Sequence, residues 1–246
     1  MLKDVIQSGA GQPGGSTAAI EAVALTAGYG RTVIVRDLSL TAAPGELVAL
    51  LGPNGAGKST TLATLAGYLP ALSGEVRVHG RKTTEPLHRR ARDGIAFVAE
   101  DRGVIRSLTV RDNIRLGRGD VAEVLEHFPE LRRRLQLSAG LLSGGEQQML
   151  CLGRALSRRP SVLLLDELSL GLAPAVVTRL HEVVRQVANA GAAVILVEQH
   201  VRKVLHVADR GYLMSRGRIV TSGSSADLRG RLSDIEDVYL SREEQS

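Results

Sequence analysis

A glycine-rich run that ends in a lysine and two hydroxyl residues is the part of this sequence best suited to chemistry. It reads Gly52-Pro53-Asn54-Gly55-Ala56-Gly57-Lys58-Ser59-Thr60. Every fixed position of the phosphate-binding pattern G-x-x-x-x-G-K-[ST] is matched. In such a loop the backbone N–H groups turn towards phosphate oxygens, Lys58 reaches the β- and γ-phosphates, and the Ser59 hydroxyl ligates Mg²⁺. The run is therefore predicted to bind a nucleoside triphosphate.

Two adjacent carboxylates, Asp166 and Glu167, end an apolar run that begins at residue 161. Asp166 at a strand end can hold the Mg²⁺ shell beside Ser59, and Glu167 can orient and polarise the attacking water as a general base. Solvated acids are the alternative, but the phosphate-binding loop upstream favours the catalytic interpretation. The guanine-reading pattern Asn-Lys-x-Asp does not occur in the sequence, so ATP is predicted rather than GTP.

A second anion-binding turn is predicted at Ser143-Gly144-Gly145-Glu146, within residues 142–148. A Ser-Gly-Gly turn that opens a helix offers backbone donors and the positive end of the helix dipole. On its own this pattern is also typical of an ordinary helix cap. Because one ATPase domain does not need two cradles for a γ-phosphate, the second turn is predicted to serve ATP bound by a partner subunit.

These residues need a scaffold that brings strand ends and helix starts together. An apolar strand at residues 46–51 and a helix at residues 59–67 flank the phosphate-binding loop, which is the setting that such a motif requires. Further strands of a parallel, helix-flanked sheet are predicted at residues 96–99, 161–167 and 193–199.

Two antiparallel features accompany this sheet in the prediction. Alternating apolar residues within 19–45 and 74–80 indicate a small antiparallel layer. Residues 210–220 predict a hairpin whose turn lies at Arg216-Gly217. The predicted fold class is therefore α/β, with a parallel core sheet, a small antiparallel β layer and helices.

The middle of the chain, at residues 101–140, is polar and rich in arginine, and it is predicted to be helical. Thr109 should cap a helix there. A helical subdomain is therefore expected at about residues 101–150, within one ATPase domain that spans residues 18–246. Residues 1–17 are rich in Gly and Ser and lack an apolar core, so a disordered tail is expected rather than a targeting sequence.

Composition and charge limit the kind of core, the covalent cross-links and the partners that the chain can have. Of the 246 residues, 43% are hydrophobic but only 2% are aromatic, so the core should be aliphatic. The single cysteine, Cys151, excludes an internal disulfide and is expected to be buried. No apolar run approaches the ~20 residues of a membrane-spanning helix. The net charge is +5, but the basic clusters at 88–92, 132–134 and 154–159 lack interleaved aromatic residues. Solvated helix faces are therefore expected there, and nucleic acid is not an expected partner.

The motifs in this order resemble those of the ATP-binding subunits of ABC transporters, from near Ala18 to near Leu240. The run from residue 52 to 60 is similar to the family's phosphate loop, residues 142–148 to its signature, and residues 161–167 to its metal-binding strand. Tyr29 stands where the family stacks an aromatic ring on adenine, although a core or turn tyrosine is the alternative.

This resemblance implies a head-to-tail dimer that sandwiches two ATPs. Each ATP would be held by the Lys58 loop of one subunit and the Ser143 turn of the other. The second ATPase subunit would be a copy of this chain or a related one. Closure on ATP and opening after hydrolysis would drive multi-span membrane permease subunits. The chain would then lie at the cytoplasmic face of the cell membrane as a peripheral protein.

A finer resemblance, to the ATPases of branched-chain amino acid importers, is carried by residues 97–104, 128–150, 168–174 and 196–199. It implies an importer for branched-chain or related amino acids. Because the cargo is recognised by the permease and not by this chain, urea, short amides or an exported lipid stay open as alternatives. A soluble ABC-type ATPase of DNA repair or translation is disfavoured, since the chain has one cassette and no sustained heptad run.

The sequence departs from the family pattern at several sites. Glu100 stands where most members carry the Gln that links Mg²⁺ to the permease-facing subdomain, and Glu100 can still reach the waters around the metal. Leu168 replaces the usual Pro, and Ala173 replaces the usual Asp. Gln199 occupies the place of the switch His, with His200 one residue later. Adjacent side chains of a strand point to opposite faces, which favours Gln199 as the γ-phosphate sensor but leaves His200 open.

Overall fold

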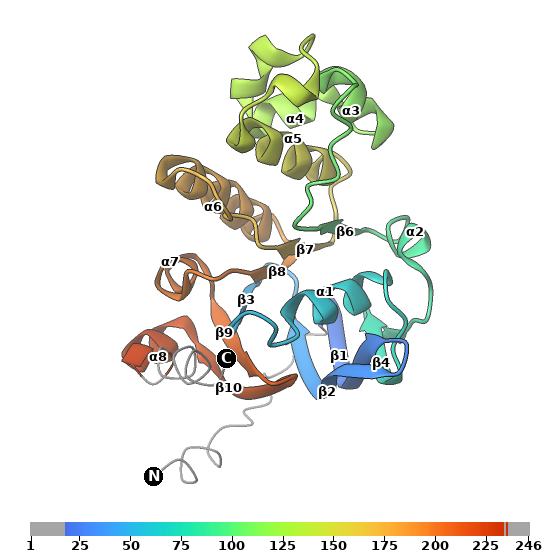
Figure 1. The fold of residues 1–246 in the computed structure, drawn as a ribbon, viewed down its shortest axis with the longest axis vertical. Coiled ribbons are helices and arrows are strands. Elements are labelled where there is room, and N and C mark those ends of the chain that lie inside the picture. The colour runs from blue at the N-terminus through green and yellow to red at the C-terminus, as the bar shows by residue number, and fades with distance from the viewer. Residues whose placement is uncertain (1–17, 234, 236–246) are drawn as a thin grey trace.

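The computed structural model describes residues 18–233 and residue 235. The predicted tail at residues 1–17 lies outside the described residues. Figure 1 shows two sheets with helices around them in the lower part of the molecule, and an upper lobe built from helices. The layers of the lower part position the phosphate-binding loop and the carboxylates Asp166 and Glu167.

The core sheet has the strand order β10-β9-β3-β8-β7-β6. Its members are β3 (Leu47–Leu51), β6 (Ile95–Val98), β7 (Val162–Asp166), β8 (Ala193–Val197), β9 (Arg210–Ser215) and β10 (Arg218–Ser224). All neighbours are parallel except β10, which runs antiparallel to β9. Every residue of β3, β7 and β8 is buried, as expected for strands covered on both faces. The predicted parallel sheet is confirmed.

The second sheet is antiparallel, with the strand order β2-β1-β4-β5. It contains β1 (Ile20–Tyr29), β2 (Thr32–Ala42), β4 (Ser73–Val78) and β5 (Arg81–Lys82). Its apolar side chains share one core cluster with Leu62 and Leu65 of α1 (Lys58–Ala66) and with residues of β3, β7 and β8. Helix α1 is therefore packed between the two sheets, and this confirms the predicted small antiparallel layer.

The upper lobe contains α3 (Val110–Leu116), α4 (Val121–His127) and α5 (Gly144–Leu156), with 3-10 turns η1 (Pro129–Arg134) and η2 (Ala139–Leu141) between α4 and α5. Thr109 caps α3 by accepting a hydrogen bond from the Asp112 N–H at 3.1 Å, as predicted. The fully buried Phe128 and Leu131 belong to the same core cluster as Leu150 of α5. The boundaries of the helical subdomain, at about residues 101–150, stay a prediction.

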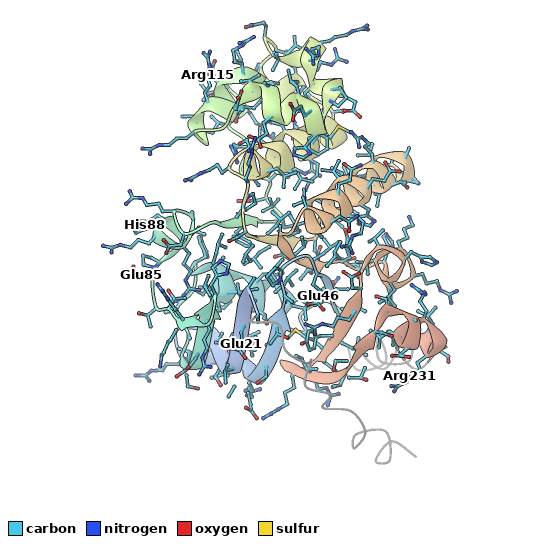
Figure 2. All side chains as sticks on the ribbon, turned by 180° about the vertical axis from the view of Figure 1, so that it is seen from behind. Glu21, Glu46, Glu85, His88, Arg115 and Arg231 are labelled. Atoms are coloured by element: carbon cyan, nitrogen blue, oxygen red, sulfur yellow. The ribbon has the colours of Figure 1, made fainter. Side chains whose placement is uncertain are left out.

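Four further helices complete the fold around the core sheet within the described residues. They are α2 (Leu87–Arg90), α6 (Pro174–Asn189), α7 (Val201–Val207) and α8 (Ser225–Gly230). The predicted hairpin is present as β9 and β10, and its turn residues Arg216 and Gly217 have φ angles of +49° and +79°. Strand β9 also joins the core sheet beside β3. An ion pair between Arg210 and Glu46 links the beginnings of β9 and β3. Glu46 is labelled in Figure 2, which shows the molecule from behind.

Many arginines of the three basic clusters are engaged in local contacts. Arg89 forms an ion pair with Glu85 at 3.3 Å, and Arg159 forms one with Glu123 at 2.6 Å. Arg154 donates a hydrogen bond to the Gly103 carbonyl at 2.7 Å. The charges of Arg89 and Arg159 are therefore partly balanced by neighbouring acids, and Arg154 is held by a carbonyl.

Candidate active site

The phosphate-binding run forms the loop between β3 and α1, with Gly52, Gly55 and Gly57 at φ angles of +146°, +71° and +104°. A Cβ at Gly52 would lie 2.4 Å from the Met214 carbonyl oxygen, so only glycine fits this close approach. The Lys58 side chain is 4% exposed, and its ammonium donates to the Gly52 and Pro53 carbonyls at 2.7 and 3.1 Å. The ammonium group of Lys58 is therefore held by backbone carbonyls of its own loop.

Ser59 and Asp166 meet where α1 begins and β7 ends. The Ser59 hydroxyl donates to Asp166 Oδ1 at 3.1 Å. The pKa of Asp166 is raised to about 6, chiefly by burial and also by the nearby carboxylates of Glu167 and Glu100, while the Ser59 hydrogen bond and the Lys58 charge oppose the rise. A buried carboxylate in this state is stabilised in its ionised form by any cation placed beside it.

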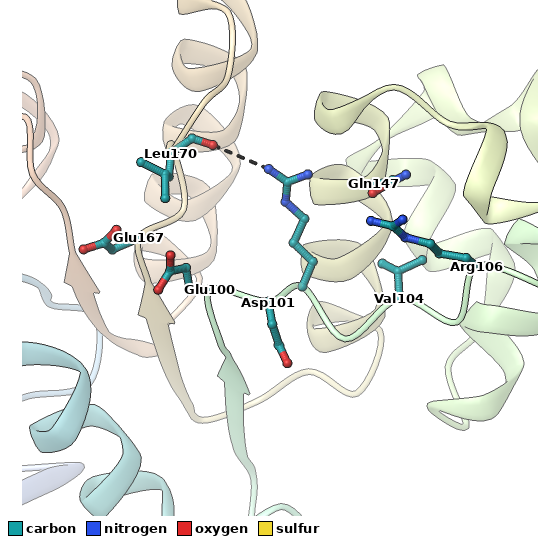
Figure 3. Close-up of a pocket in the computed structure, with 8 residues that line it drawn as sticks. Glu100, Asp101, Val104, Arg106, Gln147, Glu167 and Leu170 are labelled. Atoms are coloured by element: carbon teal, nitrogen blue, oxygen red, sulfur yellow. Dashed lines mark hydrogen bonds between the residues drawn. The ribbon is translucent and has the colours of Figure 1, made fainter.

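The oxygen atoms of Ser59 and Asp166 are of the type that Mg²⁺ prefers. Residues 18–233 and 235 contain no group of three or more His, Cys, Asp and Glu side chains that could hold a metal ion by itself. This arrangement fits a cation that keeps several waters and binds together with substrate phosphates, which is the usual behaviour of Mg²⁺. Glu100 follows β6 and lines a cavity of about 250 Å³ that Glu167 also lines (Figure 3).

Glu167 sits at the exit of β7 in an uncommon backbone conformation, with a φ angle of +50°. Its N–H donates to the Val197 carbonyl at 3.1 Å. Its Oε2 accepts a hydrogen bond from Gln199 Nε2 at 2.9 Å. His200 is exposed and is the N-cap residue of α7. Of the two open candidates, the structure places Gln199 against the predicted base.

The Ser143 turn is the N-terminus of α5. The Ser143 hydroxyl accepts from the Glu146 N–H at 3.3 Å, and the Ser143 N–H donates to Glu146 Oε2 at 2.9 Å, which makes a capping box. The Ser143 hydroxyl also donates to Glu146 Oε2 at 2.8 Å. Glu146 Oε1 is paired with Arg134 at 2.8 Å. Although partial burial raises the pKa of Glu146, the hydrogen bonds from Ser143 and Arg134 hold it below its usual value.

The two predicted phosphate-binding turns belong to different parts of the chain. Figure 1 shows α5 in the upper lobe, whereas α1 lies between the sheets below. Ser143 and Gly144 are exposed, while Gly145 is partly covered. Tyr29, the predicted adenine-stacking residue, ends β1 and is 55% exposed. These residues are therefore available to groups from outside their own lobe.

Sequence reasoning missed several side chains around these turns. Arg102 lines the same cavity as Glu100 and Glu167, and its guanidinium donates to the Leu170 carbonyl at 3.5 Å (Figure 3). A Cβ at Gly144 would lie 3.4 Å from the Arg102 guanidinium, so Arg102 also neighbours the Ser143 turn. Arg102 lies in the stretch 97–104 that carries the finer resemblance, two residues after Glu100, but nothing in the sequence assigned it to the site.

A buried polar cluster of Ser169, His181 and Glu198 was also missed. The three side chains are 6%, 6% and 2% exposed. Glu198 could have been found from its place at the end of an apolar strand, next to Gln199. His181 carried no comparable signal, because a histidine in a helix has many possible roles.

A glycine-rich loop between a buried strand and a helix, with an acidic strand end beside it, defines a P-loop nucleotide-hydrolysing protein. A family model described as ABC transporter matches residues 35–169 of the chain. The chain belongs to the ABC transporter family of ATP-binding proteins, and it is therefore an ATPase subunit of a transporter.

The similar proteins include transporters of different cargo. The branched-chain amino acid transport ATP-binding protein BraG of Pseudomonas aeruginosa is 42% identical over 222 residues, which are 86% of this chain and 95% of the relative. The lipopolysaccharide export system ATP-binding protein LptB of Escherichia coli K12 is 33% identical over 91% of this chain and 97% of its own length.

Solved structures support the same fold. A nucleotide-free ATP-binding cassette from an ABC transporter gives a TM-score of 0.83 at 22% identity, covering 90% of this chain and 98% of that one. A cassette in its ADP conformation gives a TM-score of 0.82 at 23% identity, with coverages of 92% and 99%. Within the described residues, no helix combines the length and apolar character required to cross a bilayer.

Proposed function

We propose that this chain is the ATP-hydrolysing subunit of an importer for branched-chain or related amino acids. The observation that carries the proposal is the 42% identity to BraG over 95% of that relative. Export of a lipid is the second candidate, because LptB is similar over almost its whole length at 33% identity. The higher identity to BraG favours amino acid import.

In this proposal the Lys58 loop binds the ATP phosphates, and Ser59, Asp166 and Glu100 hold Mg²⁺ directly or through its waters. Bound Mg²⁺ would supply charge neutralisation of the phosphates. Glu167 accepts the proton of the attacking water, and Gln199 senses the γ-phosphate and orients Glu167. Two observations support these roles, namely the 3.1 Å Ser59–Asp166 contact and the 2.9 Å Gln199–Glu167 contact.

A second ATPase subunit completes the proposed site. The Ser143-Gly144-Gly145 turn of one subunit donates to the γ-phosphate of ATP held by the other, and Tyr29 stacks on adenine. The exposure of Ser143, Gly144 and Tyr29 supports this arrangement. The partner is a copy of this chain or a related ATPase.

A groove beside β6 is the surface that we propose for the permease. Strand β6 is the last strand of the core sheet, and beside it lies a cavity of about 310 Å³ lined by apolar side chains that include Phe97, Cys151 and Ala155. The exposed Arg92 and Arg158 also line it. An amphipathic permease segment with acidic side chains would complement this lining. The chain would then lie on the cytoplasmic membrane face.

The test is an affinity purification of the tagged chain from gently solubilised native membranes, followed by mass spectrometry and transport measurements. Recovery of a multi-span permease whose reconstituted complex takes up leucine in an ATP-dependent manner is the expected result. Recovery of a lipid-exporting permease would favour the second candidate. Recovery of soluble partners alone, or of nucleic acid, would overturn the transport proposal for this chain.

A further inference from the structure

A buried carboxylate is the chain neighbour of Gln199, the residue that contacts Glu167. Glu198, one residue before Gln199, is 2% exposed. Its Oε2 accepts a hydrogen bond from the Ser169 hydroxyl at 2.6 Å, and its Oε1 faces His181 Nε2 at 3.4 Å. A buried carboxylate is tolerated when its oxygens have partners. Each oxygen of Glu198 has one here, so the three side chains form a complete buried network.

This network joins the two segments that carry the predicted base and the predicted sensor. Ser169 follows Glu167 by two residues, and Glu198 immediately precedes Gln199. His181 lies on α6 and anchors the network to the core. The same segments are also linked by the backbone hydrogen bond from the Glu167 N–H to the Val197 carbonyl at 3.1 Å. The two segments are thus joined by two further hydrogen bonds close to the 2.9 Å Gln199–Glu167 contact.

The uncommon backbone conformation of Glu167 explains why these links between the two segments matter. A non-glycine residue at a φ of +50° keeps that conformation only where the surrounding structure over-determines it. The Ser169–Glu198 hydrogen bond fixes the chain just after Glu167, and the Val197 carbonyl fixes Glu167 itself. Neither Ser169 nor His181 lines the cavity that contains Glu167. Their effect on catalysis must therefore pass through Glu167 and Gln199.

We propose that Ser169, Glu198 and His181 are positioning residues for ATP hydrolysis, which hold Gln199 and Glu167 in their mutual geometry. The proposal rests on the proposed function in one respect, namely that Glu167 is the base. It predicts that loss of the network lowers the rate of hydrolysis while ATP binding, which depends on the Lys58 loop, is retained.

The test is a double-mutant cycle of Ser169→Ala and Gln199→Ala, read by steady-state ATPase rates and equilibrium Mg-ATP binding. Each single change should lower kcat about 10-fold, with KM and ATP affinity within about 2-fold of the wild type. The double variant should also be lowered only about 10-fold, since both changes release the same contact. Ser157→Ala is the matched control, because Ser157 is 7% exposed and its hydroxyl donates to the Arg154 carbonyl at 2.9 Å. Its kcat should stay within about 2-fold of the wild type.

A purely structural role of Ser169 gives different results. Effects that multiply to about 100-fold in the double variant, or a Ser169→Ala enzyme with unchanged kcat, would overturn the proposal. If Ser169→Ala fails to fold, His181→Gln replaces it in the same cycle, with the same expectations. Failure of the proposed function is seen separately, because Glu167→Gln would then turn over ATP at the normal rate whatever the cycle shows.

Discussion

Replacement of the buried Asp166 by Asn should stabilise the metal-free protein, and increasingly so as the pH rises. Burial raises the pKa of Asp166 from 3.8 to about 6. Its folded-state pKa is therefore above the unfolded value, so the stability that it contributes is full below pH 3.8 and is lost as the pH rises through 6. Complete titration of a shift of about 2 units corresponds to about 3 kcal/mol.

About half of this change in the free energy of unfolding falls in a pH range in which unfolding is easily measured. Between pH 5 and pH 7.5 the advantage of Asp166→Asn over the wild type should grow by about 1.4 kcal/mol. Urea unfolding with EDTA present, followed by circular dichroism at several pH values, measures this difference directly. The same exchange at Asp93, an exposed residue after α2, is the control for the general effect of removing a carboxylate.

An advantage of Asp166→Asn that is constant or shrinks with rising pH would refute this reasoning. Addition of Mg²⁺ and ATP supplies a second check. Because a cation favours the ionised carboxylate, the wild type should gain more stability from Mg-ATP than the variant does. Equal gains for the two proteins would argue against Asp166 as a ligand of the metal.

Three further expectations follow from the same structure. Lys58→Ala should weaken ATP binding about 100-fold, since charge-assisted contacts to phosphate are lost, and isothermal titration calorimetry measures this. Glu167→Gln should keep ATP binding but lower kcat at least about 100-fold and accumulate an ATP-bound dimer in size-exclusion chromatography; a monomer with normal turnover would contradict both assignments. Burial raises the pKa of Cys151 to about 11, so at pH 8 its thiolate fraction should be about 100-fold below that of an ordinary thiol. Ellman's reagent should then label it slowly until urea unfolds the chain, and rapid labelling of the native protein would be the contrary result.

The local parts of the site were predictable from sequence because short stretches of backbone encode them. The glycines at 52, 55 and 57 specify positive φ angles within a few residues of Lys58, and Ser143 with Glu146 specifies a capping box within one helical turn. The apolar runs at residues 161–167 and 193–199 likewise predicted two strands of the parallel sheet, and they form β7 and β8, which are neighbours in it. These motifs occur along the chain in the order typical of the ABC family, and this resemblance indicated that they act together.

Contacts between distant segments could not be predicted in this way. The pairing of Arg134 with Glu146 depends on how η1 packs against α5, and the cluster of Ser169, His181 and Glu198 depends on how α6 packs on the sheet. Strand alternation favoured Gln199 over His200, but the contact with Glu167 is made after β8 has ended, where alternation no longer decides side-chain direction. The placement of the hairpin beside β3 was also missed, since its sequence predicts only that β9 and β10 pair with each other.

The hairpin turn links the end of the chain to its first motif. The Gly217 N–H donates to the Ala56 carbonyl at 3.0 Å, and the Gly217 carbonyl accepts from the Arg36 N–H at 2.8 Å. A Cβ at Gly217 would lie 2.0 Å from the Ile34 carbonyl oxygen, and the Met214 carbonyl lies against Gly52. The loop that reads as a complete motif in the first quarter of the sequence therefore takes its support from residues that the ribosome adds much later. A nascent chain that stops before β9 carries the motif without these contacts from the hairpin.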